Sequence, residues 1–450
     1  MNKTISDLNL LENVSDNDVL LVETPSETMK TTKSNLLKEV NEELNNHTHT
    51  MNDISDLITS NNYVVDSTSS IKILSSNLTS DVPVYENGYR VIFYDDFDGK
   101  YLNKFNFTSD TIKSWTAEQS KEQKTHYEMT GESILLYTDE TMKPWCPEYD
   151  GSLKVSTLMS ANRTGLHKFS AVGDGSPITN VKKEVTNLTK YGKFELRAKF
   201  NLFNDASSVN GRKNHVAWWM IGFQDRDDER CELDIFEIYG DGEYQITFHN
   251  WAKDSSLTYR NLPLSVLNPD LANTVMDGEY HTYTMEWDET SGFNFYIDNV
   301  KAGNINQFPS YPLMTILNVY EKRESNETIE RQNFEIDYFK ISKKIPENGS
   351  EVSNLLVLNQ DIHTISIVAS EDNYNEYDGI KNIDSYVDVT WNDGIITQQP
   401  VVWDEPTKEQ LAILKNGGSF ILYGDIKQIP YSSYNKRAKI NIEVTSIWAK

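Results

Sequence analysis

Three carboxylates fall within six positions in the run Glu232-Leu233-Asp234-Ile235-Phe236-Glu237, which is otherwise apolar and strand-forming. Alternation along a strand puts Glu232 and Asp234 on one face, whereas Glu237 has the opposite parity and would point into the core. A β-bulge near Ile235–Phe236 would reset this alternation, because a bulge sets two residues against one on the neighbouring strand. The sequence therefore predicts a bulged strand whose three acids line one wall of a cleft.

Burying several like charges on one strand face costs free energy, so a cluster of three carboxylates in an apolar strand indicates an active site. Two carboxyl groups about 5–5.5 Å apart suit a glycosidase that works by double displacement, in which one group attacks the sugar and the other protonates the leaving oxygen. Repulsion among neighbouring acids helps one of them stay protonated while another stays ionised. An exposed acidic strand and a calcium site are the two other readings of the same run.

Landmarks on both sides of the acids resemble the motifs of glycoside hydrolase family 16, and the acids themselves follow its Glu-x-Asp-x-x-Glu pattern. The other landmarks, in the family's order, are Val91–Gly99, Tyr191–Lys199, His215–Gly222, Phe248–Trp251, His281–Trp287 with Phe295–Asp298, and Phe334–Ile341. The resemblance covers about residues 90–344. It implies an all-β fold, a jelly-roll sandwich of the concanavalin type.

By position, the resemblance implies that Glu232 is the nucleophile, that Asp234 orients it, and that Glu237 serves first as general acid and then as general base. It further implies an endo-acting enzyme that retains the anomeric configuration. This reaction needs no cofactor and no catalytic metal, while a structural calcium ion stays compatible with the acidic composition.

The resemblance assigns sugar-stacking aromatic residues to Trp218 or Trp219 and to Trp251. Adjacent strand residues face opposite ways, so only one of Trp218 and Trp219 can reach the cleft, and the other belongs to the core. His249 lies two positions before Trp251 and shares its face. Its two readings are a place beside the nucleophile and a core position hydrogen-bonded to backbone. These four residues are the candidates for substrate binding.

Two segments depart from the family pattern. Many members carry a glycine just before the first glutamate, where this chain has Asp227-Asp228-Glu229-Arg230-Cys231, and Val319-Tyr320-Glu321-Lys322 replaces a Gly-Gly-Trp segment. Both segments belong to the expected rim of the cleft. The resemblance therefore extends to the mechanism but not to the identity of the polysaccharide.

Composition bounds the rest of the chain. Its 450 residues exceed the roughly 250 of a single sandwich, so we expect two or three domains. A formal net charge of −26 disfavours nucleic acid as a partner, because phosphates need clustered Lys and Arg.

The two cysteines, Cys146 and Cys231, give neither a disulfide framework nor metal-ligand spacing, and a single disulfide between them is compatible with the sequence. We expect no membrane span and no secretory signal, because no long apolar run or apolar leader occurs.

The first fifty residues resemble the N-terminal attachment module of phage tail and appendage proteins. The similarity rests on Ile5–Leu11, Asn17–Glu23 and Thr31–Leu37. Residues 51–88 follow as a linker or thin stalk, because most of them are polar and too few are apolar to build a core. This resemblance implies a virion protein whose partners are other phage tail proteins.

A spacing of three and then four separates Leu37, Val40 and Leu44. It predicts either a short coiled-coil seam between chains or a lone amphipathic helix. His47 and His49 resemble the His-x-His element of trimeric fibres, with solvated linker histidines as the other reading. From these features we expect a homotrimer.

A break containing Pro and Gly at residues 343–350 predicts a domain boundary. Short alternating runs follow it, namely Ile365–Val368, Tyr386–Trp391, Ser419–Gly424 and Ile440–Val444. They resemble the strands of a bacterial immunoglobulin-like domain, so a small β-sandwich is expected over residues 346–450. A glycan-binding role and a purely structural role are equally supported for it.

In chain order, the sequence predicts an attachment module over residues 1–50, a linker over 51–88, a jelly-roll hydrolase over 89–345 and an immunoglobulin-like domain over 346–450. The expected function is that of a virion-borne depolymerase that hydrolyses a polysaccharide on the surface of a host cell. A catalytically silent, receptor-binding lectin and a secreted bacterial β-glucanase are the alternatives.

Overall fold

The structure is a computed structural model. The described residues are 19–23, 28–32, 84–104, 106–109, 124–145, 147, 151–166, 183–202, 214–226, 228–250, 260–272, 274–322, 331–353, 355–360, 364–369, 383–426 and 437–446. Within these ranges, no helix is both long enough and apolar enough to cross a membrane.

The chain forms two compact units, residues 1–64 and residues 65–450. In the first unit, strands β1 (Val19–Glu23) and β2 (Thr28–Thr32) pair as an antiparallel hairpin. The trimer prediction depends on residues outside the described part of the chain: Leu37, Val40, Leu44, His47 and His49. That prediction is therefore not tested by the fold.

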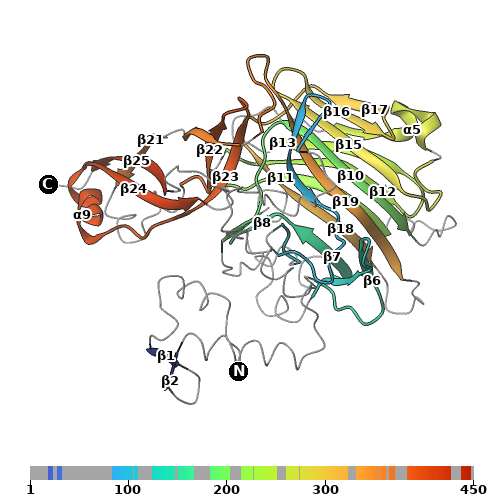
Figure 1. The fold of residues 1–450 in the computed structure, drawn as a ribbon. Helices are drawn as coiled ribbons and strands as arrows, with labels where there is room; N and C mark the ends of the chain where they lie inside the picture. The colour runs from blue at the N-terminus through green and yellow to red at the C-terminus, as the bar shows by residue number, and fades with distance from the viewer. Residues whose placement is uncertain are drawn as a thin grey trace. The chain divides into compact units, whose positions relative to one another are not determined.

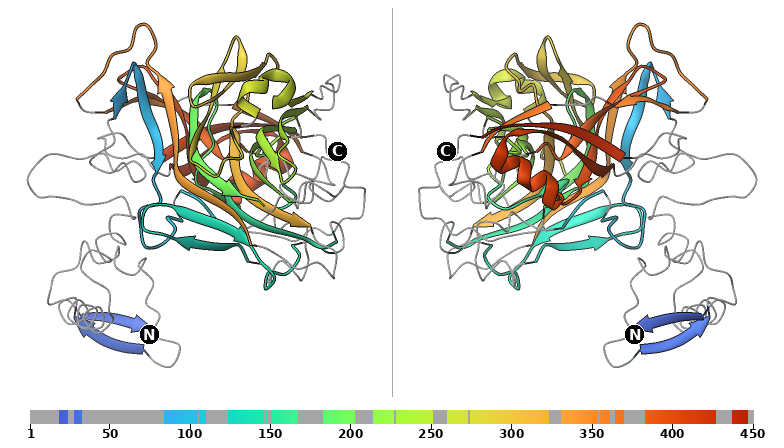
Figure 2. Two further views of the ribbon diagram at one scale, coloured as in Figure 1. Left: turned by 90° about the vertical axis from the view of Figure 1, so that its right-hand side faces the viewer. Right: turned by 90° about the vertical axis from the view of Figure 1, so that its left-hand side faces the viewer.

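In the second unit, two antiparallel sheets pack face to face as a sandwich (Figure 1 and Figure 2). The first sheet has the order β17-β16-β15-β10-β19-β4-β3, with β6 paired to β19 and β5 to β6. Its strands are β3 (Tyr85–Glu86), β4 (Tyr89–Asp95), β5 (His126–Met129), β6 (Ile134–Thr138), β10 (Gly192–Asn201), β15 (His281–Asp288), β16 (Gly292–Ile297), β17 (Val300–Ile305) and β19 (Gln332–Lys344). The first and last long strands of the sandwich, β4 and β19, are therefore neighbours.

The second sheet has the order β14-β13-β12-β11-β18-β7 and carries the acids on β12, in its middle. Its strands are β7 (Leu153–Met159), β11 (Asn214–Gly222), β12 (Cys231–Tyr239), β13 (Tyr244–Asn250), β14 (Arg260–Pro263) and β18 (Leu313–Lys322). Smaller elements are β8 (Ala161–Asn162), β9 (Glu184–Val185), α5 (Leu264–Leu267) and α6 (Pro269–Ala272). The sandwich confirms the predicted all-β jelly roll.

Side chains that alternate inward from both sheets fill the space between them. Large aromatic residues such as Phe194, Trp287 and Phe339 are buried there, and burying each side chain of this size stabilises the fold by roughly 1.5–3 kcal/mol. Cys231 belongs to the same core as a free thiol, and its burial raises the pKa of that thiol to about 12. Cys231 therefore packs as a small apolar group, as expected, while Cys146 lies outside the described residues.

The C-terminal domain is also built of strands. Its sheet has the order β20-β22-β23-β24-β25-β21, and β23 pairs with β22 through its first five residues and with β24 through its last three. The strands are β20 (Val357–Gln360), β21 (Thr364–Ala369), β22 (Tyr386–Trp391), β23 (Ile396–Trp403), β24 (Gly418–Ile426) and β25 (Arg437–Ser446). The four expected runs all lie on strands, whereas the likeness to immunoglobulin domains stays a prediction.

One helix of this domain was not expected from strand patterning. Helix α9 (Lys408–Asn416) begins after Thr407, whose side chain accepts a hydrogen bond from the backbone of Gln410, while the Gln410 side chain bonds back to the Thr407 backbone. This reciprocal pair is a capping box, a signal that the sequence Thr-x-x-Gln does carry. Leu411 and Ile413 pack the helix against the buried residues of β24 and β25.

Candidate active site

Strand β12 contains the predicted bulge. On the β11 side, Trp218 lies opposite Phe236 and Trp219 lies opposite Asp234, so Ile235 has no residue opposite it on that strand. On the β13 side, the register shifts by one residue over the same interval. The extra residue resets the alternation of the strand, as the parity of the acids requires.

The bulge brings all three acids to one face of β12. Asp234 is buried, and Glu232 and Glu237 on either side of it are half-buried. The residues between and beside them point into the sandwich core: Cys231, Leu233, Ile235, Phe236 and Ile238. The acids therefore lie on the outer face of the second sheet.

The surroundings of Asp234 shift the pKa of its carboxyl group. Burial raises its pKa well above the usual range, and the neighbouring charges of Glu232 and Glu237 raise it further. The neutral form of Asp234 is thus favoured more than that of an exposed carboxyl group. A neutral Asp234 can donate a hydrogen bond to a neighbouring carboxylate, which is what an orienting residue must do.

His249 lies beside the acids rather than in the core. It is directly opposite Glu232 on β13, and its Nε2 atom is 3.9 Å from Oε1 of Glu232 and 3.9 Å from Oδ2 of Asp234. Of the two predicted positions for His249, the structure shows the one beside Glu232. Glu232, Asp234 and His249 are also a group that can hold a metal ion, because their ligand atoms lie within 4.8 Å of one another.

Tyr239 and two aromatic neighbours extend the site beyond Glu237. The hydroxyl of Tyr239 donates to Oε1 of Glu237 at 3.0 Å. His215 of β11 lies opposite Tyr239, and its ring stacks on that of Tyr320 with centroids 4.2 Å apart. Burial lowers the pKa of His215 to about 3, so its ring is neutral. Tyr239 lies two positions after Glu237, so alternation along the strand puts the two side chains on one face. This spacing could have identified Tyr239 as a site residue from the sequence.

The structure decides between the two adjacent tryptophans. Trp218 is fully buried and makes edge-to-face contacts with Phe236 and Phe339, so of the two it is the core residue, and it is no longer a candidate for substrate binding. Trp219 is on the face of the acids, where its Nε1 atom donates to Oδ1 of Asn318 at 3.0 Å. Trp251 lies outside the described residues, and its role stays a prediction.

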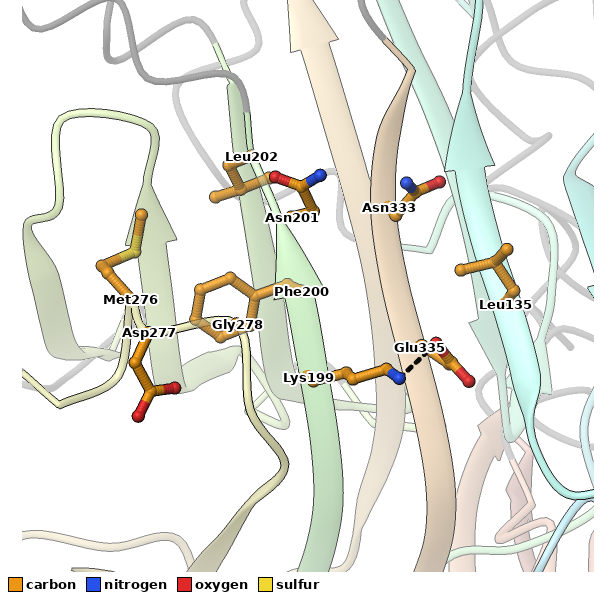
Figure 3. Close-up of a pocket in the computed structure, with 10 residues that line it drawn as sticks. All are labelled: Leu135, Lys199, Phe200, Asn201, Leu202, Met276, Asp277, Gly278, Asn333 and Glu335. Carbon is orange, nitrogen blue, oxygen red and sulfur yellow. Dashed lines mark ion pairs between the residues drawn. The ribbon is translucent and has the colours of Figure 1, made fainter.

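A pocket of about 390 Å³ lies away from the acids, on strands of the first sheet (Figure 3). The ion pair between Lys199 and Glu335, 3.1 Å long, lines it. Glu335 also accepts hydrogen bonds from Tyr280 and Ser133, which hold the pKa of its carboxyl below the usual range against the opposing effect of burial. Glu335 is thus held in an ion pair and two hydrogen bonds at this pocket, apart from the acids of β12.

Comparison with known proteins gives one family. Residues 148–340, which include the three acids and His249, match the family model for glycosyl hydrolases family 16. No curated protein matches the chain.

Several solved structures are similar to the chain. One is a GlcNAcα1-4Gal releasing endo-β-galactosidase from Clostridium perfringens, at 23% identity over 78% of this chain and 91% of that chain, with a TM-score of 0.48. A second is the laminarinase catalytic domain from Thermotoga maritima, at 15% identity over 58% of this chain and 100% of that chain, with a TM-score of 0.37. A third is the catalytic domain of an endo-1,3-β-glucanase from Thermotoga petrophila, at 16% identity over 57% of this chain and 99% of that chain, with a TM-score of 0.37.

Proposed function

We propose, on the premise that residues 148–340 form a glycoside hydrolase family 16 domain, that the protein is an endo-acting glycosidase that hydrolyses a polysaccharide with retention of configuration. One observation carries the proposal: the bulge of β12 places Glu237 on the same face as Glu232. In retaining glycosidases the two carboxyl groups lie about 5–5.5 Å apart, which leaves no room for a water molecule between enzyme and sugar, so one of them attacks directly.

In the first step, a carboxylate oxygen of Glu232 attacks the anomeric carbon. The glycosidic C–O bond breaks, and Glu237 gives its proton to the leaving oxygen. In the second step, Glu237 takes a proton from water, the hydroxide oxygen bonds to the anomeric carbon, and Glu232 leaves as a carboxylate. The Tyr239 hydroxyl bonded to Glu237 fixes the position of that carboxyl group through both steps.

Asp234 and His249 hold the nucleophile in place. Burial and the charges of Glu232 and Glu237 favour the neutral form of Asp234 by raising its pKa, and in that form Asp234 can donate toward a carboxylate without adding a negative charge beside Glu232. His249, at 3.9 Å from Glu232, lies within reach of a hydrogen bond after a small movement. Their common effect is to orient Glu232 toward the sugar.

A panel of polysaccharides tests this function, with reducing ends measured after incubation and the anomer of the first product read by proton NMR. Release of shorter chains, with the original anomer appearing first, is the expected result. Initial appearance of the inverted anomer would refute the pairing of Glu232 with Glu237. Binding to a glycan without any release would favour the receptor-binding lectin instead.

We further propose that the enzyme is carried by a phage tail, where it degrades a polysaccharide of the host surface as a homotrimer. The support is the resemblance of residues 1–50 to attachment modules and the spacing of Leu37, Val40 and Leu44. Mass spectrometry of purified phage particles tests the location. Absence of the chain from particles that still degrade the host polysaccharide would refute it.

A further inference from the structure

The loop over residues 223–230 joins β11 to β12 and therefore leads directly into the nucleophile. It follows Gly222, the last residue of β11, where an added Cβ atom would lie only 2.2 Å from the carbonyl oxygen of Glu229. The two ends of the loop thus touch, and a shift of Glu229 moves the first residues of β12 with it. Anything that fixes this loop helps to fix Glu232.

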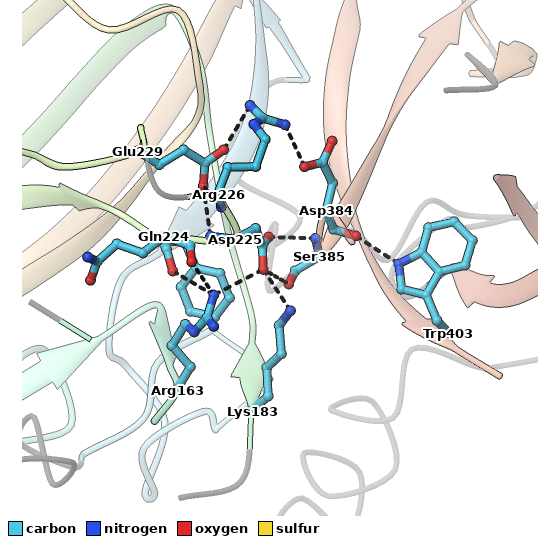
Figure 4. Close-up of polar contacts among 10 residues, drawn as sticks. Arg163, Lys183, Gln224, Asp225, Arg226, Glu229, Asp384, Ser385 and Trp403 are labelled. Atoms are coloured by element: carbon cyan, nitrogen blue, oxygen red, sulfur yellow. Dashed lines mark hydrogen bonds and ion pairs between the residues drawn. The ribbon is translucent and has the colours of Figure 1, made fainter. Parts of the chain in front are cut away.

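Asp225, which is only 1% exposed, is the first residue by which the loop is held, through the polar contacts drawn in Figure 4. From the hydrolase, Lys183 donates to its carboxylate at 2.7 Å and Arg163 approaches it at 3.4 Å. From the C-terminal domain, Ser385 donates both its backbone N–H at 2.6 Å and its hydroxyl at 2.9 Å. A buried carboxylate needs such donors, and Ser385 supplies two of them.

Arg226 is the second residue by which the loop is held. Its guanidinium contacts Asp384 of the C-terminal domain at 2.6 Å and Glu229 of the same loop at 2.9 Å. The other oxygen of Glu229 accepts the backbone N–H of Asp225 at 2.9 Å. Ion pairs therefore run without interruption from Asp384 through Arg226 to Glu229, the residue three positions before Glu232 (Figure 4).

An apolar contact runs parallel to this polar network. Tyr386, next to Ser385, belongs to one buried cluster with Ile221 and Trp219 of β11. Ile221 lies directly opposite Glu232, and Trp219 lies opposite Asp234. The C-terminal domain thus packs on the same sheet face that carries the acids.

The rest of the interface is equally well packed. Arg90 of β4 and Asp393 form an ion pair at 3.2 Å, and both side chains are almost fully buried. Lys343 of β19 donates to the carbonyl oxygen of Ile396 at 2.7 Å. Buried ion pairs of this kind tolerate little movement, because separating them leaves uncompensated charges. The two domains belong to one compact unit.

We propose that the C-terminal domain is part of the catalytic unit, and that Ser385 and Asp384 are positioning residues that hold the loop over residues 223–230 and thereby place Glu232. The inference rests on the proposed function, because it concerns the residues that orient Glu232 as the nucleophile. It assigns the C-terminal domain a role in positioning Glu232, in place of a purely structural or a glycan-binding role.

Hydrogen exchange in the full chain tests the proposal without a known substrate. In the double variant Ser385→Ala with Asp384→Ala, peptides over residues 223–239 should lose protection, while peptides of β15 and β16 keep theirs. The conservative variant Ser385→Thr retains a hydroxyl and should stay close to the wild type. Tyr85→Phe is the matched control, because it removes a hydrogen bond to Asp393 in the same interface but at β3. Unchanged exchange over residues 223–239 in the double variant would overturn the proposal.

Kinetics on whichever glycan is cleaved give the second measurement. The double variant should lower kcat on the order of tenfold with little change in KM, since a small displacement of a reacting group is enough for such a loss. Equal kcat values for wild type and double variant, with only a lower Tm, would also overturn the proposal and leave the domain a purely stabilising role. If the wild type cleaves no glycan, the proposed function fails while hydrogen exchange still decides the question of positioning.

Discussion

Trp219 lies directly opposite Asp234, whereas its neighbour Trp218 lies opposite Phe236. Residues that face each other across an antiparallel pair project from the same side of the sheet. One tryptophan is therefore on the side of the acids and the other is in the core, although they are adjacent in the sequence. The same substitution at these two positions should have different effects on catalysis.

We expect Trp218→Phe and Trp219→Phe each to lower the Tm, because both indoles are buried. Only Trp219→Phe should lower kcat/KM, on the order of tenfold, since it also removes the hydrogen bond to Asn318 on the face of the acids. Activity is to be measured well below either Tm. Equal losses of kcat/KM in the two variants would contradict the assignment of faces.

Replacing Glu232 or Glu237 with Gln should leave the fold intact and lower turnover by several orders of magnitude, on the order of a thousandfold or more, because an amide neither attacks nor donates a proton properly. An aryl glycoside with a good leaving group needs no proton, so Glu237→Gln should lose less on it than Glu232→Gln does. Glu132→Gln, an exposed carboxylate between β5 and β6, is the control. Near-normal turnover in Glu237→Gln would remove Glu237 from the mechanism.

Asp234 should make the protein less stable as the pH rises. Its pKa is raised in the folded state, so the folded protein binds the proton more tightly than the unfolded chain does. The stabilisation is complete below the unfolded pKa of about 3.8 and is lost as the pH rises through the folded pKa. Asp234→Asn should therefore gain stability over the wild type at pH 8 and not at pH 4, as measured by denaturant unfolding.

Asp288 provides a control of opposite sign for this experiment. Hydrogen bonds from the side chain and backbone of Thr290 lower its pKa to about 2. Its stabilisation is present above the unfolded pKa and is lost as the pH falls through about 2. Asp288→Asn should thus be less stable than the wild type at pH 8. A gain for Asp288→Asn, or a loss for Asp234→Asn, would contradict a lowered pKa at Asp288 or a raised pKa at Asp234.

Zinc should inhibit the enzyme, and a chelator should leave its activity unchanged. A tetrahedral zinc ion bound at about 2.0–2.2 Å needs ligand atoms slightly more than 3 Å apart, and Nε2 of His249 is 3.9 Å from oxygens of both Glu232 and Asp234. A small movement therefore suffices for binding. His249→Gln should raise the zinc concentration needed for half-inhibition. Loss of activity in the chelator would mean that a metal takes part in the reaction.

The full chain should be a trimer in light scattering. A seam of Leu37, Val40 and Leu44 is too short to hold an isolated helix, so it gains stability only when chains share it. A chain lacking residues 1–80 should be a monomer with unchanged activity, because the acids all lie on one strand of one chain. A monomeric full-length protein would contradict the trimeric assembly.

The acids and the strands around them could be predicted because their signals are local. The opposite parity of Asp234 and Glu237 requires a bulge whatever the rest of the chain does, and the structure has it. The docking of the C-terminal domain could not be predicted. Asp225 and Ser385 are 160 residues apart, and no sequence motif around either residue predicts their contact. Tyr239 is intermediate between the acids and the domain contact. Its spacing of two from Glu237 predicts that both side chains lie on one face, but the hydrogen bond between them depends on side-chain geometry that the spacing does not fix.

The pairing of β4 with β19 has a consequence for synthesis of the chain. Val91 of β4 lies opposite Ser342 of β19, so the edge of β4 stays without this neighbour until most of the chain has left the ribosome. The partner of Arg90, Asp393, emerges later still. Contacts so distant in sequence slow folding and leave an open strand edge exposed in the meantime. Until β19 is made, the nascent chain therefore exposes an unpaired edge of β4, which favours pairing with other chains.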